Sequence, residues 1–582
     1  MKKIIGASVG SCIHVAGIIN FLKIASELGF ETKFIGSAVN SKKIIEEIDR
    51  FSPDIIGLSY RLSPESAVGV FSELKESLEK YFSQKTNKAF PSLSQQEISK
   101  NNTEKTKINK KELNYKYPDG GKIKFILGTT KPVMYALKEN GILNIFDKVF
   151  TGGESFNEIK NYLLSQNSQK ELLNILPQNL IERINYKKPY PLLRHHFGRP
   201  SFNETLEGIK IIADSKLIDV ISIGPDQNTQ EFFFNPSKMD HNQDGAGGVP
   251  IRSEEDLKKI YEASRTGNFP LLRCYSGTNN ILQFAEVLVK NINNAWCAIP
   301  LCWYNELDNR SGRTLKDAIS ENQLVMKWHA QKNIPVEVNE SHHWSLRYAP
   351  DSIAVAAAYL AAYNAKKMGV KNYISQYMFN TPPETSFTMD LAKMLAKIDL
   401  IESLHDENFI SWRQTRTGLF SMEANFNKNK GQLASSTLLQ MQLDPSIVHV
   451  VAYCESEYAA KPEDIIESAQ IVTKVIDNYL NGCPDMKNDK DVQERKKQLI
   501  NDARLIINKI KELDFEHKFE DPLISPEIIS KAIKLGILDA PHLKGVKAAC
   551  GKILTKFFNG ANYAIDKNGN ILSEKERLNI IY

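Results

Sequence analysis

Several features that define other protein classes are missing from this 582-residue chain. No stretch approaches the roughly 18 consecutive apolar residues that indicate a membrane-spanning helix, so we expect no membrane segment. The 74 basic and 69 acidic residues nearly balance, at a net charge of +5, and no arginine-rich tract occurs. This composition argues against a dedicated nucleic-acid-binding protein. We therefore predict that neither a membrane nor a nucleic acid is among its partners.

Cysteine is scarce and scattered: the seven residues show none of the Cys-x-x-Cys spacings of structural zinc or iron–sulfur sites. An odd, dispersed set in a large chain is typical of a reducing cytosol rather than of a disulfide framework, so we predict a cytoplasmic location. Met1-Lys2-Lys3 and the apolar residues up to Cys12 resemble the start of a bacterial signal peptide. That apolar run is short and is interrupted by Gly and Ser, so a first strand leading into a helix fits better.

The first 165 residues alternate apolar strand patterns with amphipathic helix patterns. Five strands joined by crossover helices predict an α/β unit with an open parallel sheet of the flavodoxin-like (Rossmann-like) type, in which ligands bind at the carboxyl ends of the strands. Residues 82–121 are rich in Lys, Asn, Ser and Gln, and we predict a flexible insertion there because the segment has too few apolar residues to bury. The predicted strands are residues 3–9, 33–36, 55–59, 122–127 and 148–151.

The longer remainder of the chain repeats this alternation. Seven strand patterns separated by helices across residues 201–482 predict a (β/α)8 barrel of the TIM type, although no apolar run marks the eighth strand. We predict a linker at residues 166–200 and, at residues 483–582, a helical extension with a C-terminal tail that packs on the barrel. The seven strands are residues 220–224, 270–274, 295–301, 335–338, 373–377, 409–412 and 448–454.

The most informative motif follows the first strand directly and opens a helix: Cys12-Ile13-His14-Val15-Ala16-Gly17. It resembles the Asp-x-His-x-x-Gly signature of base-off cobalamin-binding domains, with Cys12 at the Asp position. Residues 6–14 are also similar to the start of the small subunit of glutamate (methylaspartate) mutase. The resemblance implies that His14 is the axial ligand to cobalt and that Gly17 lets the nucleotide tail of cobalamin pass close to the helix. The alternative is an ordinary loop histidine.

Cys12 is a departure from that signature. In the family the Asp accepts a hydrogen bond from the ligating imidazole and fixes its tautomer, whereas a thiol is a weak acceptor. Further segments carry the resemblance: Gly57-Leu58-Ser59 matches the step where a hydroxyl meets the tail, and Gly152-Gly153-Glu154 resembles a closing Gly-rich turn. Gly128-Thr129-Thr130 stands where the family has a Gly-Gly pair. The resemblance implies cofactor contacts within all three segments.

The second half resembles the large, barrel-forming subunit of the same mutase. Residues 270–278 resemble its Arg-His-Gly-Thr-Pro strand end, and residues 369–372 and 536–541 resemble further segments. The two subunits thus look fused into one chain, and the resemblance implies that the barrel caps the corrinoid with the substrate between them. Tyr453 and Glu457 fall where the family has a Lys and a Glu that contact the adenosyl ribose, so the Glu is retained and the Lys is missing.

Arginine is a natural partner for a substrate carboxylate because its guanidinium binds in bidentate fashion. Arg273 ends a predicted barrel strand, where such barrels carry their active sites, and Arg310, Arg313 and Arg347 lie in later loops. His343 follows another histidine, and adjacent side chains diverge, so we expect no joint metal site there. It is either an acid/base group or a packed histidine.

Together these observations predict an adenosylcobalamin-dependent carbon-skeleton mutase that acts by radical rearrangement on a small carboxylate or amino acid substrate. Two alternatives stay open: a corrinoid methyltransferase that uses methylcobalamin, and a non-catalytic corrinoid-binding protein. A homodimer is compatible with either. The predicted catalytic residues are Arg273, Arg310, Arg313, Arg347, His343 and Glu457. The predicted cofactor residues are Cys12, His14, Gly17, Ser59, Gly128, Thr129, Gly152, Gly153 and Tyr453, with His14 as the metal ligand.

Overall fold

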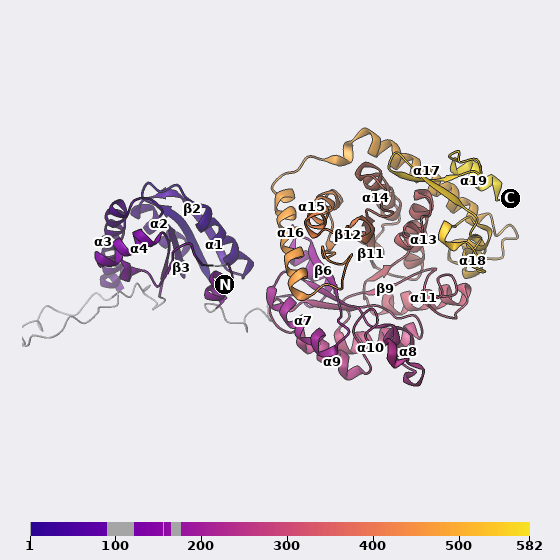
Figure 1. Ribbon diagram of the computed structural model, residues 1–582, viewed down its shortest axis with the longest axis horizontal. Coiled ribbons are helices and arrows are strands. Elements are labelled where there is room, and N and C mark those ends of the chain that lie inside the picture. Colours follow the sequence, from indigo (N-terminus) through magenta and orange to yellow (C-terminus); the bar gives the residue numbers. More distant parts are fainter. Residues whose placement is uncertain (1, 90–121, 155, 165–175, 582) are drawn as a thin grey trace, which may run out of the picture. The chain divides into compact units, whose positions relative to one another are not determined.

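The computed structural model describes residues 2–89, 122–154, 156–164 and 176–581. The chain divides into two compact units, an N-terminal unit (Met1–Glu171) and a barrel unit (Leu172–Tyr582), and each is built on its own parallel sheet (Figure 1). In the described ranges no helix is long and apolar enough to cross a membrane.

The N-terminal unit has a five-stranded parallel sheet with the order β2-β1-β3-β4-β5. Helices α1 and α5 pack on one face, and α2, α3 and α4 pack on the other. This is the predicted doubly wound architecture, whose strand order reverses between β1 and β3. The elements are β1 (Lys3–Val9), α1 (Ala16–Glu27), β2 (Glu31–Val39), α2 (Ser41–Phe51), β3 (Ile55–Ser59), α3 (Pro64–Ala89), β4 (Lys124–Gly128), α4 (Lys131–Glu139), β5 (Lys148–Phe150) and α5 (Phe156–Leu164).

The central strands β1 and β3 are apolar runs because helices cover both of their faces. Two glycines bring α1 close to these strands. A Cβ added at Gly6 would lie 2.7 Å from Leu22 Cδ1, and one at Gly57 would lie 2.9 Å from Ile18 Cδ1. The tight packing leaves no room for a larger residue at either position.

Helix α3 corrects the start of the predicted insertion. It runs from Pro64 to Ala89, so residues 82–89 continue a helix instead of opening a loop. Leu74, Leu78 and Phe82 are buried at helical spacing in the core of the unit, and this burial outweighs the polar composition of the segment. The rest of the predicted insertion, residues 90–121, lies outside the described residues.

The barrel unit has eight parallel strands in the order β8-β7-β6-β13-β12-β11-β10-β9, which confirms the predicted α/β barrel class. The seam between β8 and β9 is bridged by a 2.8 Å hydrogen bond from the Ala295 amide to the Leu272 carbonyl. The Asn294 side chain adds a second link, because it accepts from the Cys274 amide at 3.0 Å. The strands are β6 (Leu192–Phe197), β7 (Val220–Ile223), β8 (Leu271–Cys274), β9 (Cys297–Ile299), β10 (Val336–Val338), β11 (Asn372–Phe379), β12 (Ile410–Thr417) and β13 (Ile447–His449).

Strand β6 is the eighth strand that the sequence patterns did not locate. It lies inside residues 166–200, predicted above as a linker, and so does α6 (Leu180–Lys187), which packs against the first residues of several strands. The barrel therefore begins before residue 201. The strand lacks an apolar run because Arg194 and His196, alternate residues along it, line a cavity within the barrel.

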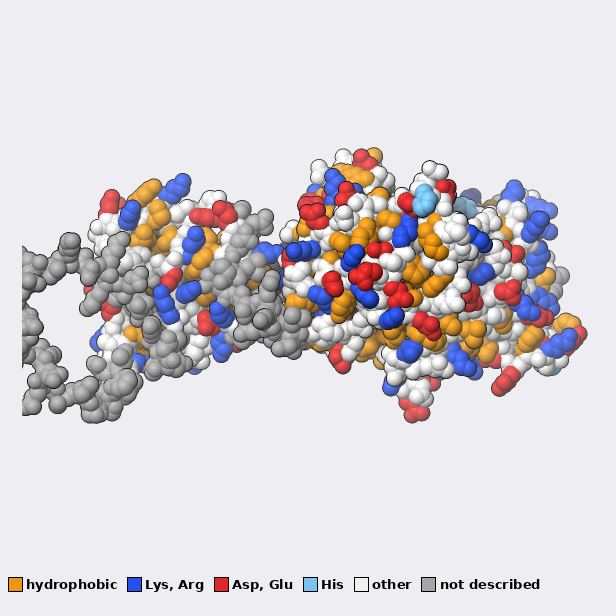
Figure 2. Space-filling view, turned by 90° about the horizontal axis from the view of Figure 1, so that it is seen from below, with side chains coloured by type: hydrophobic (Ala, Val, Ile, Leu, Met, Phe, Trp, Pro, Cys, Tyr) orange, Lys and Arg blue, Asp and Glu red, His pale blue; other side chains and the backbone are white. Residues whose placement is uncertain are grey.

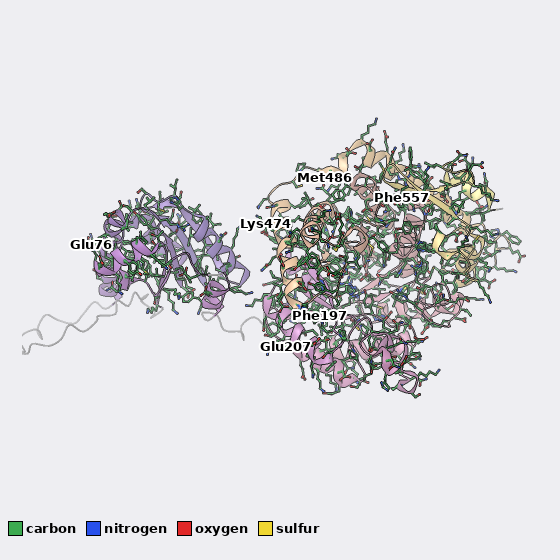
Figure 3. The ribbon with its side chains drawn as sticks, in the orientation of Figure 1. Glu76, Phe197, Glu207, Lys474, Met486 and Phe557 are labelled. Atoms are coloured by element: carbon green, nitrogen blue, oxygen red, sulfur yellow. The ribbon has the colours of Figure 1, made fainter. Side chains whose placement is uncertain are left out.

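Helices surround the barrel, and some lie very close to its strands. Phe197, labelled in Figure 3 near Glu207 of α7, is so near that helix that a Cβ at Gly208 would lie 2.3 Å from its ring. The helices are α7 (Phe202–Ser215), α8 (Gln227–Phe232), α9 (Glu254–Ala263), α10 (Ile281–Ile292), α11 (Leu315–Gln331), α12 (Ser341–Ser345), α13 (Asp351–Lys367), α14 (Phe387–Glu402), α15 (Phe426–Met441) and α16 (Pro462–Leu480).

The C-terminal segment lies against α13 and α14 (Figure 1). A buried ionic cluster joins these parts: the carboxylate of Asp351, the first residue of α13, lies 3.3 Å from Lys393 Nζ of α14. The same carboxylate accepts hydrogen bonds of 3.1 Å from Arg495 Nη2 and from the Asn562 amide. The elements are α17 (Lys490–Lys511), α18 (Pro526–Leu535), an antiparallel hairpin of β14 (Leu554–Phe558) and β15 (Ala561–Ile565), and α19 (Glu574–Ile580).

Candidate functional site

The N-terminal unit presents His14 on the loop between β1 and α1. The side chain is exposed, while Cys12 is fully buried beneath it with Sγ 3.7 Å from His14 Nδ1. Two hydroxyls fix this loop: Ser8 donates to the Cys12 carbonyl at 2.5 Å, and Ser59 of β3 donates to the His14 carbonyl at 3.3 Å. Among the described residues, Nε2 of the imidazole has no hydrogen-bond partner. The loop therefore presents an exposed imidazole whose Nδ1 lies near a thiol and whose Nε2 is left without a partner in the described residues.

A cavity of about 310 Å³ lies beside this loop, at the carboxyl ends of β3, β4 and β5 and the start of α1. Its apolar side chains include Phe21, Leu58 and Phe150. A Cβ at Gly17 would meet no atom within 4 Å, so the first turn of α1 leaves an open approach to the cavity. Of the predicted cofactor residues, those lining the cavity are Gly17, Ser59, Gly128, Thr129 and Gly152.

Glu154 stiffens the turn after β5. It belongs to the Gly152-Gly153-Glu154 segment, in which only the two glycines are predicted cofactor residues. Its carboxylate accepts from the Thr151 amide at 2.9 Å and from the Gly152 amide at 2.8 Å. Burial raises the pKa of Glu154, but these backbone hydrogen bonds outweigh it and the pKa lies below its ordinary value. Gly153 does not line the cavity. Arg61, two residues beyond Ser59, does line the cavity. The sequence feature that could have identified it is its position just past the end of a strand.

These residues fit a base-off corrinoid. Such a cofactor needs a neutral protein imidazole for cobalt and a space for its apolar heterocyclic tail. His14 offers the imidazole, and the cavity next to it is lined by apolar side chains together with polar ones such as Ser59 and Thr129. Over the described part of the chain, no group of three or more His, Cys, Asp or Glu side chains is arranged to hold a metal ion.

The barrel unit has a cavity of about 340 Å³ at the carboxyl ends of its strands, which we call the arginine cavity. Four arginines line it: Arg194 on β6, Arg273 on β8, Arg416 on β12, and Arg310 in the loop after β9. Among the described residues that line it, none is Asp or Glu. On the barrel face seen in Figure 2, by contrast, acidic and basic side chains are interspersed. The remaining lining residues are His196, Gln230, Tyr275, Tyr304, Asn339, His342, His343, Leu346, Gln376, Met378, Leu419 and Phe420.

Arg194 is rigidly held. Its Nε donates to Ser222 Oγ at 2.7 Å, its Nη1 donates to Gln414 Oε1 at 2.7 Å, and its Nη2 lies 2.6 Å from His196 Nε2. Burial and the neighbouring Arg273 lower the pKa of Arg194 to about 9, so it remains charged at neutral pH. Arg194 is not among the predicted site residues because residues 166–200, which include its strand, were predicted to be a linker.

Arg273 is also buried, at 1% exposure, but its hydrogen bonding is incomplete. Its Nη2 lies 3.5 Å from Glu337 Oε2, while Nε and Nη1 have no hydrogen-bond partner. The ring of Tyr275 lies 4.9 Å from the guanidinium carbon and holds the group in place. A buried donor without a partner is costly, so these two nitrogens are suited to an anionic ligand in the cavity.

The three histidines of the arginine cavity are neutral at pH 7. Burial lowers the pKa of His196, His342 and His343 well below the ordinary value, and neighbouring arginines add to the effect. His343 Nε2 is buried without a hydrogen-bond partner. It can therefore accept or donate one hydrogen bond to a bound molecule.

Other predicted catalytic residues lie outside this cavity. Arg313 pairs with Glu321 and donates to the Tyr304 carbonyl at 2.8 Å, so it braces a loop. Arg347 stacks 3.9 Å above the Trp303 ring. Thus Arg273, Arg310 and His343 are brought together, whereas these two arginines support the wall behind them.

The two residues matched to ribose contacts are also outside. Glu457 is exposed, and the buried Tyr453 donates to Glu467 at 2.8 Å on α16. A second cavity of about 340 Å³ adjoins the arginine cavity, sharing His196, Tyr275 and Arg416 with it, and its acidic residue is Glu455. Glu455 Oε1 lies 3.0 Å from His195 Nε2. The sequence contains this carboxylate two positions from the predicted one, and only the strand-end geometry distinguishes them.

No protein-family model matches the chain, and no curated protein matches it. Among solved structures, the chain matches the 1.5 Å crystal structure of a novel cobalamin-binding protein from Desulfitobacterium hafniense DCB-2, at 18% identity and a TM-score of 0.18. That match covers 28% of this chain and 57% of the other protein's length.

Proposed function

We propose that this chain is a cobalamin-dependent carbon-skeleton mutase, an isomerase that holds adenosylcobalamin on its N-terminal unit and a small carboxylate substrate in its barrel unit. The observation that carries the proposal is the arginine cavity: four guanidiniums line a pocket without an acidic residue at the catalytic end of a barrel. The exposed His14 beside an apolar cavity supports the corrinoid half.

In the N-terminal unit, His14 would hold cobalt through Nε2, since Nδ1 faces the Cys12 thiol. The apolar cavity would take the heterocyclic tail, with the Ser59 hydroxyl among its lining groups. When bound, adenosylcobalamin supplies the one-electron chemistry at carbon that a skeleton rearrangement needs.

In the barrel unit, the arginine cavity binds and orients the substrate. Arg273 offers an unpaired N–H, at Nε or at Nη1, to a carboxylate, while Arg194, fixed by three contacts, supplies a rigid positive charge. His343 Nε2 holds or accepts a proton at the wall of the pocket. The exposed apolar side chains of Leu419 and Phe420 line the same cavity and help to exclude water from it.

The test is anaerobic incubation of the full chain, loaded with adenosylcobalamin, with a panel of small mono- and dicarboxylic acids and amino acids. We expect an isomerised product from at least one acid, detected by proton NMR, and no product from an Arg194→Ala variant. Transfer of a methyl group from methylcobalamin without isomerisation would instead identify a methyltransferase. Corrinoid binding with neither reaction would leave a non-catalytic corrinoid-binding protein.

A further inference from the structure

We infer that the substrate of the arginine cavity is a small dicarboxylate without an amino group. The inference rests on the proposed function, because it treats this cavity as the substrate site. It narrows the substrate from carboxylates and amino acids in general to one chemical class.

The first argument is a count of unpaired positive charges. Among the described residues, neither Arg194 nor Arg416 has an acidic side chain within ion-pair distance, 4.0 Å. The other two arginines of the cavity each face a carboxylate, at 3.5 and 3.8 Å. A guanidinium withdrawn from water needs a compensating anion, so the two guanidiniums without an acidic partner leave two positive charges that two substrate carboxylates would neutralise, with the unpartnered Nε and Nη1 of Arg273 as donors to them.

The second argument is that an ammonium group finds no carboxylate partner among the described residues that line the cavity. Glu337, beneath Arg273, already accepts from Trp296 Nε1 at 2.6 Å and does not line the pocket. Glu340 is 1% exposed and accepts from two backbone amides at 2.9 and 3.0 Å. Glu337 Oε1 has no hydrogen-bond partner, but this buried side chain does not line the pocket. The side chain of Asp308, which faces Arg310 and Arg347, is 4% exposed and does not line it either. None of these three carboxylates is therefore presented to a molecule in the cavity.

The adjoining cavity does not change this conclusion. Its carboxylate, Glu455, accepts from the Ala452 amide at 2.7 Å and faces His195 at 3.0 Å. An α-ammonium in the arginine cavity would thus lie among four like charges, and each such contact is unfavourable in a partly buried site. The lining histidines are neutral and so do not change the charge of the cavity.

The experiment compares pairs of acids that differ only in the amino group. Binding to the full chain, with and without adenosylcobalamin, is measured by isothermal titration calorimetry for glutarate against L-glutamate and for succinate against L-aspartate. We expect the diacid of at least one pair to bind at least tenfold more tightly than its amino analogue. Equal or tighter binding of the amino acid in both pairs, or no binding of either diacid, would overturn the inference.

A variant gives an independent readout. Gln376 lines the cavity and its Oε1 accepts from Gln414 Nε2 at 3.3 Å, so Gln376→Glu adds a carboxylate of nearly the same shape. We expect this change to reduce the preference for the diacid at least tenfold. The matched control is Gln442→Glu, because Gln442 lies at the start of the α15–α16 connection and does not line the cavity. This control should leave the preference for the diacid unchanged. An unaltered preference in a folded Gln376→Glu protein would count against the inference.

These outcomes separate the inference from the proposed function. Binding needs no turnover, so a diacid preference without any isomerised product refutes the mutase and leaves the ligand class intact. Isomerisation of an amino acid does the reverse, because it supports the mutase and overturns the ligand class.

Discussion

Replacing Arg273 by lysine tests the arginine cavity most directly. The guanidinium has two buried donors, Nε and Nη1, without a partner in the protein. Lysine keeps the positive charge near Glu337, but its single ammonium group cannot replace donors at both the Nε and the Nη1 positions, which point to opposite sides of the guanidinium. A hydrogen bond to a charged group contributes about 1.5–3 kcal/mol, so the loss of one such bond weakens binding by about 10- to 150-fold.

The assay is the dissociation constant of glutarate, measured by calorimetry on the full chain. Arg313→Lys is the matched control, because this arginine pairs with Glu321 outside the cavity. We expect the Arg313→Lys protein to bind glutarate with the same dissociation constant as the parent protein. Thermal unfolding of both variants checks that the barrel remains folded. An Arg273→Lys protein that is folded and binds glutarate as tightly as the parent would refute the assignment of these donors to a substrate carboxylate.

Three further predictions concern the cofactor, the buried ionic cluster and pH. His14→Ala should remove the visible-spectrum signature of histidine-ligated cobalamin in the reconstituted protein. The control His241→Ala, at a side chain that is 87% exposed, should retain that signature. An unchanged spectrum in His14→Ala would contradict the ligand assignment. Lys393→Met leaves Asp351 and Asp390 buried with less compensation, so we expect a loss of about 3–5 kcal/mol in the free energy of unfolding by urea, against little change for the exposed Lys490→Met. The pKa of His449 is lowered well below its ordinary value by burial and by Arg194, so in acid the unfolded chain binds the proton that the folded chain excludes. Stability should therefore fall as pH drops below about 6.5, by up to about 1.4 kcal/mol per pH unit for each such histidine, and His449→Gln should make urea denaturation less sensitive to pH between 7.5 and 5.5.

The elements that could be predicted from the sequence are those whose buried residues form a regular apolar pattern. Strands β1 and β3 are covered on both faces, and their continuous apolar runs were sufficient to place them. Strand β6 was missed for the opposite reason: Arg194 and His196 face a polar cavity, so alternation of apolar residues is absent where the site lies. The residues that build the site thus removed the signal that locates their strand.

The candidate site shows the same division. Arg273 was identifiable because it ends an apolar strand, and His14 because its loop follows one. Which of Glu455 and Glu457 turns toward the barrel depends on a single tight turn after β13, and sequence spacing alone does not determine it. Arg416 was not predicted as a site residue because β12 extends to Thr417, beyond the predicted end of that strand.

The position of Asp351 bears on where this chain can be shortened. One carboxylate receives contacts from α14, from α17 and from the β14–β15 hairpin, so it connects the barrel wall with the last part of the chain. A protein cut before α17 would expose apolar surface of α13 and α14 to water and would leave Asp351 without two of its donors. Expression of the barrel as an independent fragment therefore requires residues 490–581, which act as its outer wall rather than as a removable appendage.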